Sequence, residues 1–276
     1  MLALVAACLA AARSAPAEIV RRSVSRDQDN GKLARNYTFI QRIEERKLGK
    51  TGNVQEVESR TVEVLILYGR PYERLIALDG KPPDAAREKK EEEKLAKETA
   101  RRKREFDSAT SRRKREAEFE TNRERRRRFL LEAPDAFDFR LAGEELSGGR
   151  RCWVIDAALK HGYRPRDSRA GKLLTKFRGR LWIDREEYPW VRAEAETIGT
   201  VSFVWFLARL GEGARVIFEQ EKINGGIWLP RASRIRFDAR LGLVKSVRRE
   251  VDLTFRDYRK FQAESRVVST SEAPVP

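Results

Sequence analysis

Apolar and polar residues alternate along much of the chain after residue 36 with the period of two that a β-strand requires. The clearest case is the segment 173–183. One side carries Leu173, Thr175, Phe177, Gly179, Leu181 and Ile183, and the other carries Lys176, Arg178, Arg180 and Trp182. This pattern predicts a strand with one face buried and the other in water.

The same criterion predicts most of the remaining strands. They fall at 37–44, 61–68, 73–78, 137–141, 152–159, 190–197, about 200–210, 214–222, 227–238 and 243–262. Turn-forming residues separate them, and short connections make neighbouring strands antiparallel. We therefore expect a mainly β, α+β protein: one large curved antiparallel sheet, or incomplete β-barrel, with helices covering its apolar face.

The first residues predict export. An apolar run, Met1 to Ala12, is followed by Ala15-Pro16-Ala17, which is the small-x-small pattern of a signal-peptide cleavage site. Residues 1–17 are predicted to be a cleaved signal, which would place the protein in the periplasm or cell envelope. A lipid anchor at Cys8 and a buried N-terminal helix are the alternatives. Residues 18–34 predict a helix that breaks at 29–31, and residues 269–276 predict a disordered tail.

A strongly charged segment interrupts the strands. Residues 84–128 contain 18 Lys/Arg and 12 Asp/Glu and few large apolar residues, a composition that favours a solvated helix. Leu95 and Phe106 share one helical face and Phe119 and Leu130 another, but the two pairs are out of phase by about 140° on a continuous helix. Together with the capping residues around Ser108, this predicts two helices or one kinked helix within an insertion at 84–131, acting as a lid or as a protruding arm.

Charge suggests anionic partners. The net charge of +16 fits nucleic acid, phospholipid head groups or an acidic protein. Many acids of the insertion lie three or four positions from a base, where they can pair along a helix, and export would separate the protein from nucleic acid. We therefore expect the insertion to contact an envelope protein or an anionic membrane surface. The residues expected to do so are Arg101, Arg102, Arg104, Arg112, Arg113 and Arg115.

The sequence contains no recognisable catalytic motif. His161 is the single histidine, in an apparent turn, and Cys152 would be the single cysteine after signal cleavage, in a context typical of a small buried side chain. We expect no metal and no cofactor. Asp184, Glu186 and Glu187 fall in one turn, where charge is ordinary, so a glycosidase pair is not favoured. The prediction is a non-enzymatic protein.

An apolar run at 201–207 favours either core or the rim of an apolar cavity. A concave sheet under helices could bind acyl chains with few specific polar residues, because apolar burial is non-directional. The residues expected to line such a cavity are Phe177, Leu181, Ile183, Phe203, Trp205, Phe218 and Phe237.

Several segments resemble the outer-membrane lipoprotein carrier superfamily, which has the LolA/LolB-like fold. They are Asn36 to Gln41, Gly179 to Asp184 with Tyr188, Pro189 and Val191 to Glu194, Ile227 to Pro230, and Phe255 to Phe261. The resemblance implies an incomplete β-barrel with a helical lid over a cavity for acyl chains of lipids or lipoproteins. It implies a single domain, residues 18–268, which we expect to be a monomer. The long charged insertion departs from small carriers.

Overall fold

The computed structural model of the protein describes residues 15–165, 170–203, 208–223, 226–241 and 245–261. Its helices are α1 (Pro16–Ala34), α2 (Ala85–Asp107), α3 (Ala109–Ala136) and α4 (Ala170–Leu174). The strands are β1 (Tyr37–Leu48), β2 (Val54–Leu67), β3 (Arg70–Leu78), β4 (Phe137–Ser147), β5 (Arg150–Leu159), β6 (Phe177–Asp184), β7 (Trp190–Thr197), β8 (Val201–Phe203), β9 (Ala208–Leu210), β10 (Arg215–Ile223), β11 (Ile227–Leu241) and β12 (Lys245–Lys260).

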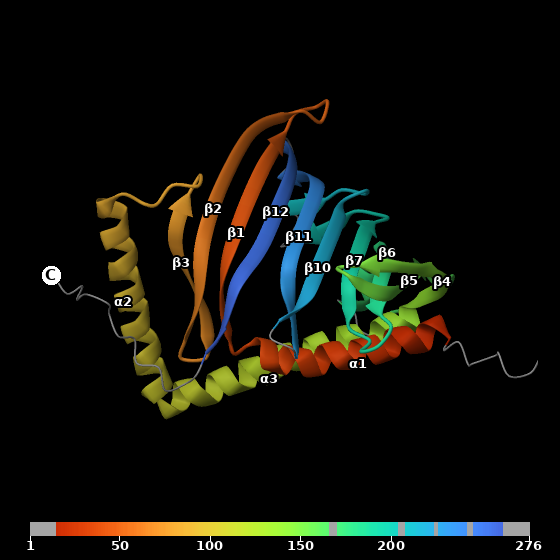
Figure 1. Ribbon diagram of the computed structural model, residues 1–276, viewed down its shortest axis with the longest axis horizontal. Coiled ribbons are helices and arrows are strands. Elements are labelled where there is room, and N and C mark those ends of the chain that lie inside the picture. Colours follow the sequence, from red (N-terminus) through yellow and green to blue (C-terminus); the bar gives the residue numbers. More distant parts are fainter. Residues whose placement is uncertain (1–14, 166–169, 204–207, 224–225, 242–244, 262–276) are drawn as a thin grey trace, which may run out of the picture.

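One antiparallel sheet organises the molecule, as the strand patterns predicted (Figure 1). Its order is β3-β2-β1-β12-β11-β10-β7-β6-β5-β4, and the short strands β8 and β9 join it through β11. The ends of the chain meet in the middle of this order, because β1 pairs with β12 from Tyr37 opposite Lys260 to Leu48 opposite Arg248. The sheet is open, with β3 at one edge and β4 at the other.

The two faces of the sheet differ in chemistry. Leu181, Ala193 and Phe218 are direct cross-strand neighbours on β6, β7 and β10, and mark what we call the apolar face. The residues one position away along each strand point to the opposite face, which we call the charged face. They form a row of direct cross-strand neighbours. It crosses eight strands, from β1 to β4, through Glu44, Asp252, Arg234, Ile217, Glu194, Arg180, Asp156 and Arg140.

Helix α1 packs on the apolar face. Ile19 and Val20 of α1 are buried against Ile155 and Ile183 of β5 and β6. At its other end, the Asn30 amide donates to the carbonyl of Trp228 at 2.6 Å and accepts from its N–H at 2.8 Å. The sequence predicted a helix break at residues 29–31, and this was wrong. Helix α1 continues to Ala34, with Asn30 tied to β11 through its side chain.

The charged insertion connects the two edges of the sheet. Strands β3 and β4 follow each other in the chain but are separated by nine strand spacings, which is about 43 Å. Helix α3 has 28 residues, and at 1.5 Å per residue is about 42 Å long. In Figure 1, α3 runs below the sheet beside α1, and the two helices are in contact. The helices α2 and α3 therefore form a crossover from one edge to the other.

The predicted break in the insertion is confirmed. Helix α2 ends at Asp107 and α3 begins at Ala109, with Ser108 between them in an extended conformation. The Ser108 hydroxyl accepts from the N–H of Ser111, so Ser108 caps α3. The phase change between the two apolar pairs thus marks a real change of direction.

Helix α2 covers the edge strand β3. Arg102 is the buried residue of α2, and its guanidinium donates to the carbonyls of Arg70 at 2.8 Å and Pro71 at 3.1 Å. It also lies over the Tyr72 ring and bonds to Glu98 at 2.5 Å. Arg102 therefore binds backbone carbonyls at the end of the β2–β3 hairpin, where β3 begins.

Two strand predictions need correction. Residues 170–174 form α4, with Leu174 buried against Ala136 and Phe137, so the strand predicted from residue 173 begins at Phe177. The segment predicted as one strand at about 200–210 holds two strands, because Val201 pairs antiparallel with Leu210 and the chain must reverse between them.

We expect Arg102→Gln to loosen α2. Losing the guanidinium leaves the carbonyls of Arg70 and Pro71 without their charged donor, which should lower the free energy of opening α2 by about 2 kcal/mol. Native-state hydrogen exchange across residues 85–107 measures this. Arg101→Gln is the matched control, since Arg101 is exposed and pairs only within α2. Equal acceleration of exchange in both variants would contradict the assignment.

Candidate functional site

The described residues predicted to line a cavity lie on the apolar face. Leu181 and Phe218 flank Ala193 in one cross-strand row, and the Phe218 ring lies 4.7 Å from that of Trp190 between centroids. Phe177 and Phe237 are on the same face of β6 and β11 by strand alternation. All four are half-buried. The structure therefore brings these four predicted residues together on one face of the sheet.

The remaining residues predicted to line a cavity lie in the core or outside the described residues. Ile183 is completely buried against α1, which makes it part of the core. Phe203 ends β8, but its side chain, like the whole of Trp205, lies outside the described residues.

Small residues form the row beside Leu181: Ala157, Gly179 and Ala195 are direct neighbours on β5, β6 and β7. They form a low strip between the larger side chains of this face.

Two hollows are on the charged face, whereas the sequence predicted a cavity on the apolar face. One hollow, of about 740 Å³, crosses β4, β5, β6, β7 and β10. The other, of about 360 Å³, crosses β7, β10, β11, β12 and β1, and Ile217 belongs to both. Their walls are rows of charged side chains, and we call the two together the arginine groove. Its arginines are Arg140, Arg178, Arg180 and Arg215 in the larger hollow and Arg42, Arg46, Arg192 and Arg234 in the smaller.

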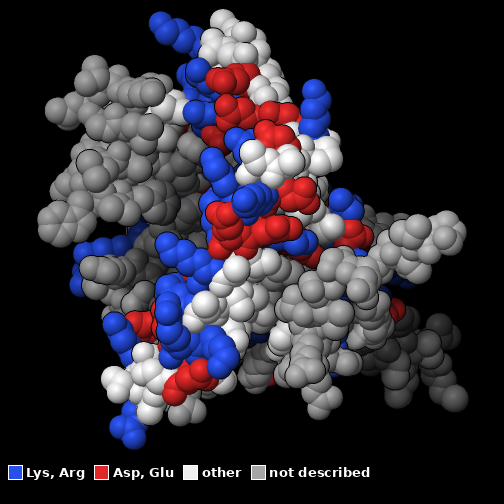
Figure 2. Space-filling view, turned by 90° about the vertical axis from the view of Figure 1, so that its left-hand side faces the viewer, with Lys and Arg blue, Asp and Glu red and all other residues white. Residues whose placement is uncertain are grey.

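The residues predicted to contact a membrane or partner are only partly available. Arg102 faces β3 and is buried, whereas Arg101, Arg104 and Arg113 are exposed. The side chains of Arg112 and Arg115 lie outside the described residues. Figure 2 shows acidic and basic side chains interleaved on the surface around α2. Hydrogen bonds from Arg101 and Arg102 lower the pKa of Glu98 to about 2, so charge on α2 is matched locally.

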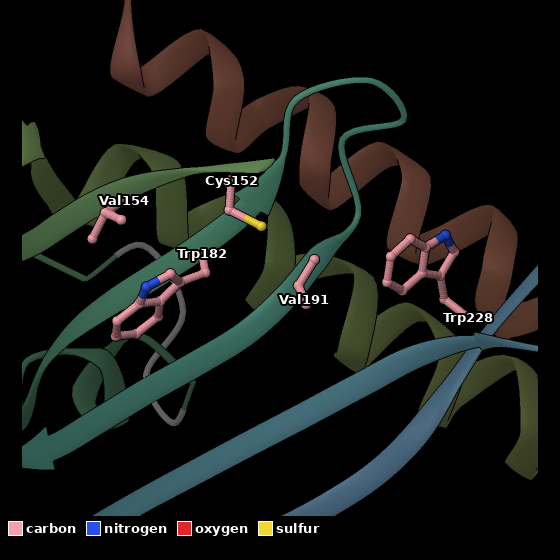
Figure 3. Close-up of a cluster of buried hydrophobic side chains, with 5 residues drawn as sticks. All are labelled: Cys152, Val154, Trp182, Val191 and Trp228. Carbon is pink, nitrogen blue, oxygen red and sulfur yellow. The ribbon is translucent and has the colours of Figure 1, made fainter. Parts of the chain in front are cut away.

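The single described cysteine is not a nucleophile at neutral pH. Cys152 is completely buried in a cluster with Val154, Trp182, Val191 and Trp228 (Figure 3). Burial, with a contribution from the charge of Asp184, raises the pKa of its thiol to about 11. His161 is exposed in a turn. Within the described ranges, no three His, Cys, Asp or Glu side chains group as metal ligands would, and no helix is long and apolar enough to cross a membrane.

The carboxylates of the β6–β7 turn are structural. Asp184 is 1% exposed and accepts from Arg150 Nε at 2.5 Å and from the N–H groups of Glu186 and Glu187 at 3.0 and 2.7 Å. Burial acts to raise the pKa of Asp184, but these hydrogen bonds outweigh it and lower the pKa. Glu187 in turn pairs with Lys222 at 2.6 Å. The sequence predicted ordinary charge in this turn, whereas the structure shows that Asp184 is buried and ion-paired.

Sequence reasoning missed the arginine groove. It interpreted Arg178 and Arg180 as the water-facing side of a single strand, and the cross-strand register that joins them to other arginines cannot be deduced from any one segment. The sequence contained one signal of the groove: every basic residue that lines it is Arg and none is Lys. Trp190 was missed as a member of the apolar face because its position at the start of a strand does not indicate which face its side chain joins.

No model of a known protein family matches the sequence, and no curated protein does. Among solved structures, the chain is similar to a DUF1329 family protein from Desulfovibrio piger, at 14% identity and a TM-score of 0.32 over 91% of this chain and 96% of the other. An outer membrane lipoprotein-sorting protein domain from Vibrio parahaemolyticus is 9% identical, with a TM-score of 0.32 and coverage of 90% and 95%. A LolA superfamily protein from Nitrosomonas europaea is 10% identical, with a TM-score of 0.31 and coverage of 90% and 94%. At these values, the likeness carries nothing about ligands.

Cys152 should resist thiol reagents. In a Cys8→Ala variant, where Cys152 is the single thiol, reaction with a disulfide reagent at pH 8 should be more than about a hundredfold slower in the native protein than in urea, because a thiol of raised pKa holds little thiolate. Absorbance of the released thiolate follows the reaction. Rapid native labelling would contradict the buried, protonated state.

Replacing Arg150 tests the Asp184 turn. A carboxyl whose folded pKa is lowered contributes stability above its unfolded pKa of about 3.9 and loses it as the pH falls through the folded value. Arg150→Gln should therefore lower the free energy of unfolding by about 3 kcal/mol at pH 7, and by progressively less in acid below pH 4. Urea unfolding across pH measures it, with the exposed neighbour Arg151→Gln as control. A loss that does not depend on pH would refute the ion-pair explanation.

Proposed function

We propose that the protein is an exported, non-enzymatic envelope protein that binds an amphiphile, the acyl chain of a lipid or lipoprotein, on the apolar face of its sheet. The observation that carries this proposal is the shared placement of Phe177, Leu181, Phe218 and Phe237 on one face, half-buried, beside a strip of small residues. Each of the four keeps part of its surface exposed.

The small strip gives the proposed site its shape. Ala157, Gly179 and Ala195 leave the backbone low beside the row that Leu181, Ala193 and Phe218 form. A Cβ at Gly179 would come within 2.9 Å of the Glu194 carbonyl oxygen, so the strands approach closely here. An acyl chain lying in such a strip would gain about 25 cal/mol for each Å² of apolar surface removed from water. No specific polar partner is required.

Export is consistent with the packing of α1. The predicted cleavage precedes Glu18, and the buried residues of α1 begin at Ile19. The helix begins at Pro16, so cleavage would remove two residues of its first turn and leave the residues that contact β5 and β6. The proposed mature chain therefore retains its core.

Filling the strip should block acyl binding. We expect Ala195→Leu to weaken binding of palmitate at least about tenfold, equivalent to about 1.4 kcal/mol, because the added side chain occupies the proposed path of the acyl chain. Displacement of a fluorescent fatty acid from the full chain measures the affinity, and circular dichroism checks the fold.

The control is the same substitution on the other face. Ala158 is exposed on the charged face of β5, so Ala158→Leu should leave palmitate affinity unchanged. Should Ala195→Leu fail to fold, Phe218→Ala provides a second reduction of binding through loss of contact. Equal affinity of all variants and the parent protein, or no uptake of fatty acid or phospholipid by any of them, would reject the proposal.

A further inference from the structure

The apolar face of the sheet becomes charged toward β2. One row of cross-strand neighbours on this face runs from β6 to β1 through Leu181, Ala193, Phe218, Ser233, Leu253 and Ile43, and its next member, on β2, is Arg60. The row that contains the low strip runs from β5 to β12 through Ala157, Gly179, Ala195, Val216, Ile235 and Val251, and continues to Glu45 on β1 and Glu58 on β2. Each row is uncharged over six strands and then ends in charged side chains.

Four charged side chains at this end of the apolar face form two ion pairs. Arg249 on β12 is 2.7 Å from Glu45, between Nη1 and Oε1. Lys47 on β1 is 3.5 Å from Glu56 on β2, between Nζ and Oε2. These four charges therefore neutralise one another.

Glu58 and Arg60 remain outside these pairs. Both are exposed, and neither has a hydrogen bond or ion pair with the residues that the structure describes. They are two positions apart on β2, which puts both side chains on the same face with their Cα atoms about 7 Å apart. One negative and one positive charge thus lie side by side where the two uncharged rows end.

The surroundings of these two charges differ. Glu58 is directly opposite Glu45, and like charges in such a pair are destabilising, so both carboxylates would stabilise a cation here. Arg60 is directly opposite Ile43 on one side and Leu78 on the other. Its planar guanidinium can donate two parallel hydrogen bonds to a phosphate. The end of the apolar face therefore offers an anion site beside a cation site.

We propose that the ligand of the apolar face is a phospholipid whose head group carries a phosphate and a primary ammonium, as in phosphatidylethanolamine. This proposal rests on the proposed acyl site and adds the head group that accompanies the acyl chain. Arg60 binds the phosphate, and Glu58 and Glu45 accept hydrogen bonds from the ammonium. A head group with a phosphate alone would face two carboxylates, and a trimethylammonium head group has no N–H to donate.

The distance along the sheet fits one lipid molecule. Five strand spacings, about 24 Å, separate β2 from β7, which carries Ala195. Half of a bilayer, head groups included, is about 21 Å thick, and this is the length of one lipid. A lipid with its phosphate at Arg60 therefore ends near Ala195, in the low strip.

The experiment compares ligands that share one palmitoyl chain and differ in their head groups. Displacement of a fluorescent fatty acid from the full chain, below the critical micelle concentrations, measures their affinities. Lysophosphatidylethanolamine should bind at least about fivefold more tightly than lysophosphatidylglycerol or lysophosphatidylcholine, because only its head group satisfies both charges. Monopalmitoylglycerol, which is uncharged, measures binding of the chain alone.

Substitutions at the two charges separate their roles. Glu58→Gln should abolish the preference for lysophosphatidylethanolamine over lysophosphatidylglycerol, and Glu58→Lys should reverse it. Arg60→Gln should weaken binding of both lipids about fivefold, because both contain a phosphate. Monopalmitoylglycerol should bind all variants equally. The matched control, Glu93→Gln with Lys97→Gln on α2, removes one charge of each sign from exposed positions and should change no affinity.

Two kinds of failure are distinguishable. If no palmitoyl ligand binds, monopalmitoylglycerol included, both the acyl site and the head-group site are rejected. If these ligands bind with equal affinity, or if Glu58→Lys leaves the preference unchanged while circular dichroism shows a native fold, the acyl site stands and the head-group site alone is overturned.

Discussion

The connection between the edges of the sheet constrains the rest of the structure. Strands β3 and β4 are consecutive in the chain but lie at opposite edges, and the chain between them must cross about 43 Å. A flexible chain could make the crossing, but α3 does so as one helix of matching length. This requirement explains why a long helical segment stands between strands. It also shows that deleting the insertion would disconnect the sheet rather than remove a separate arm.

The two ends of the crossover contact the two edge strands of the sheet. At β3, the chain turns at Asp84 into α2, which places Arg102 against the carbonyls of Arg70 and Pro71. At β4, α3 ends in Ala136, which is completely buried with Phe137 and Leu174. The helix thus arrives on the apolar face, next to the area that α1 covers. The charged face has no such covering among the described helices, and its hollows remain open.

Much of this arrangement could be predicted from the sequence, and the exceptions have physical reasons. Strand alternation identified the antiparallel sheet, and it assigned Leu181 to a buried face and Arg180 to the opposite one. The helix break at Ser108 followed from phase and capping. Sequence could not predict that β1 pairs with β12 or that Arg215 opposes Arg236, because such register depends on contacts between distant segments. Arg102 was misplaced for the same reason, since its burial depends on the edge of β3.

The proposed function rests on the apolar face of the sheet, where half-buried side chains and a low strip fit an acyl chain. On the opposite face, arginines and carboxylates pair with one another across the strands.

The most direct measurement for the acyl-binding claim is native mass spectrometry of the protein purified from the cell envelope without detergent. We expect a fraction of the protein molecules to carry the added mass of a fatty acid or phospholipid. This added mass should be lost on denaturation and missing from the Ala195→Leu variant. Protein that shows only the mass of its polypeptide, and gains no adduct when palmitate or phospholipid is added, would contradict it.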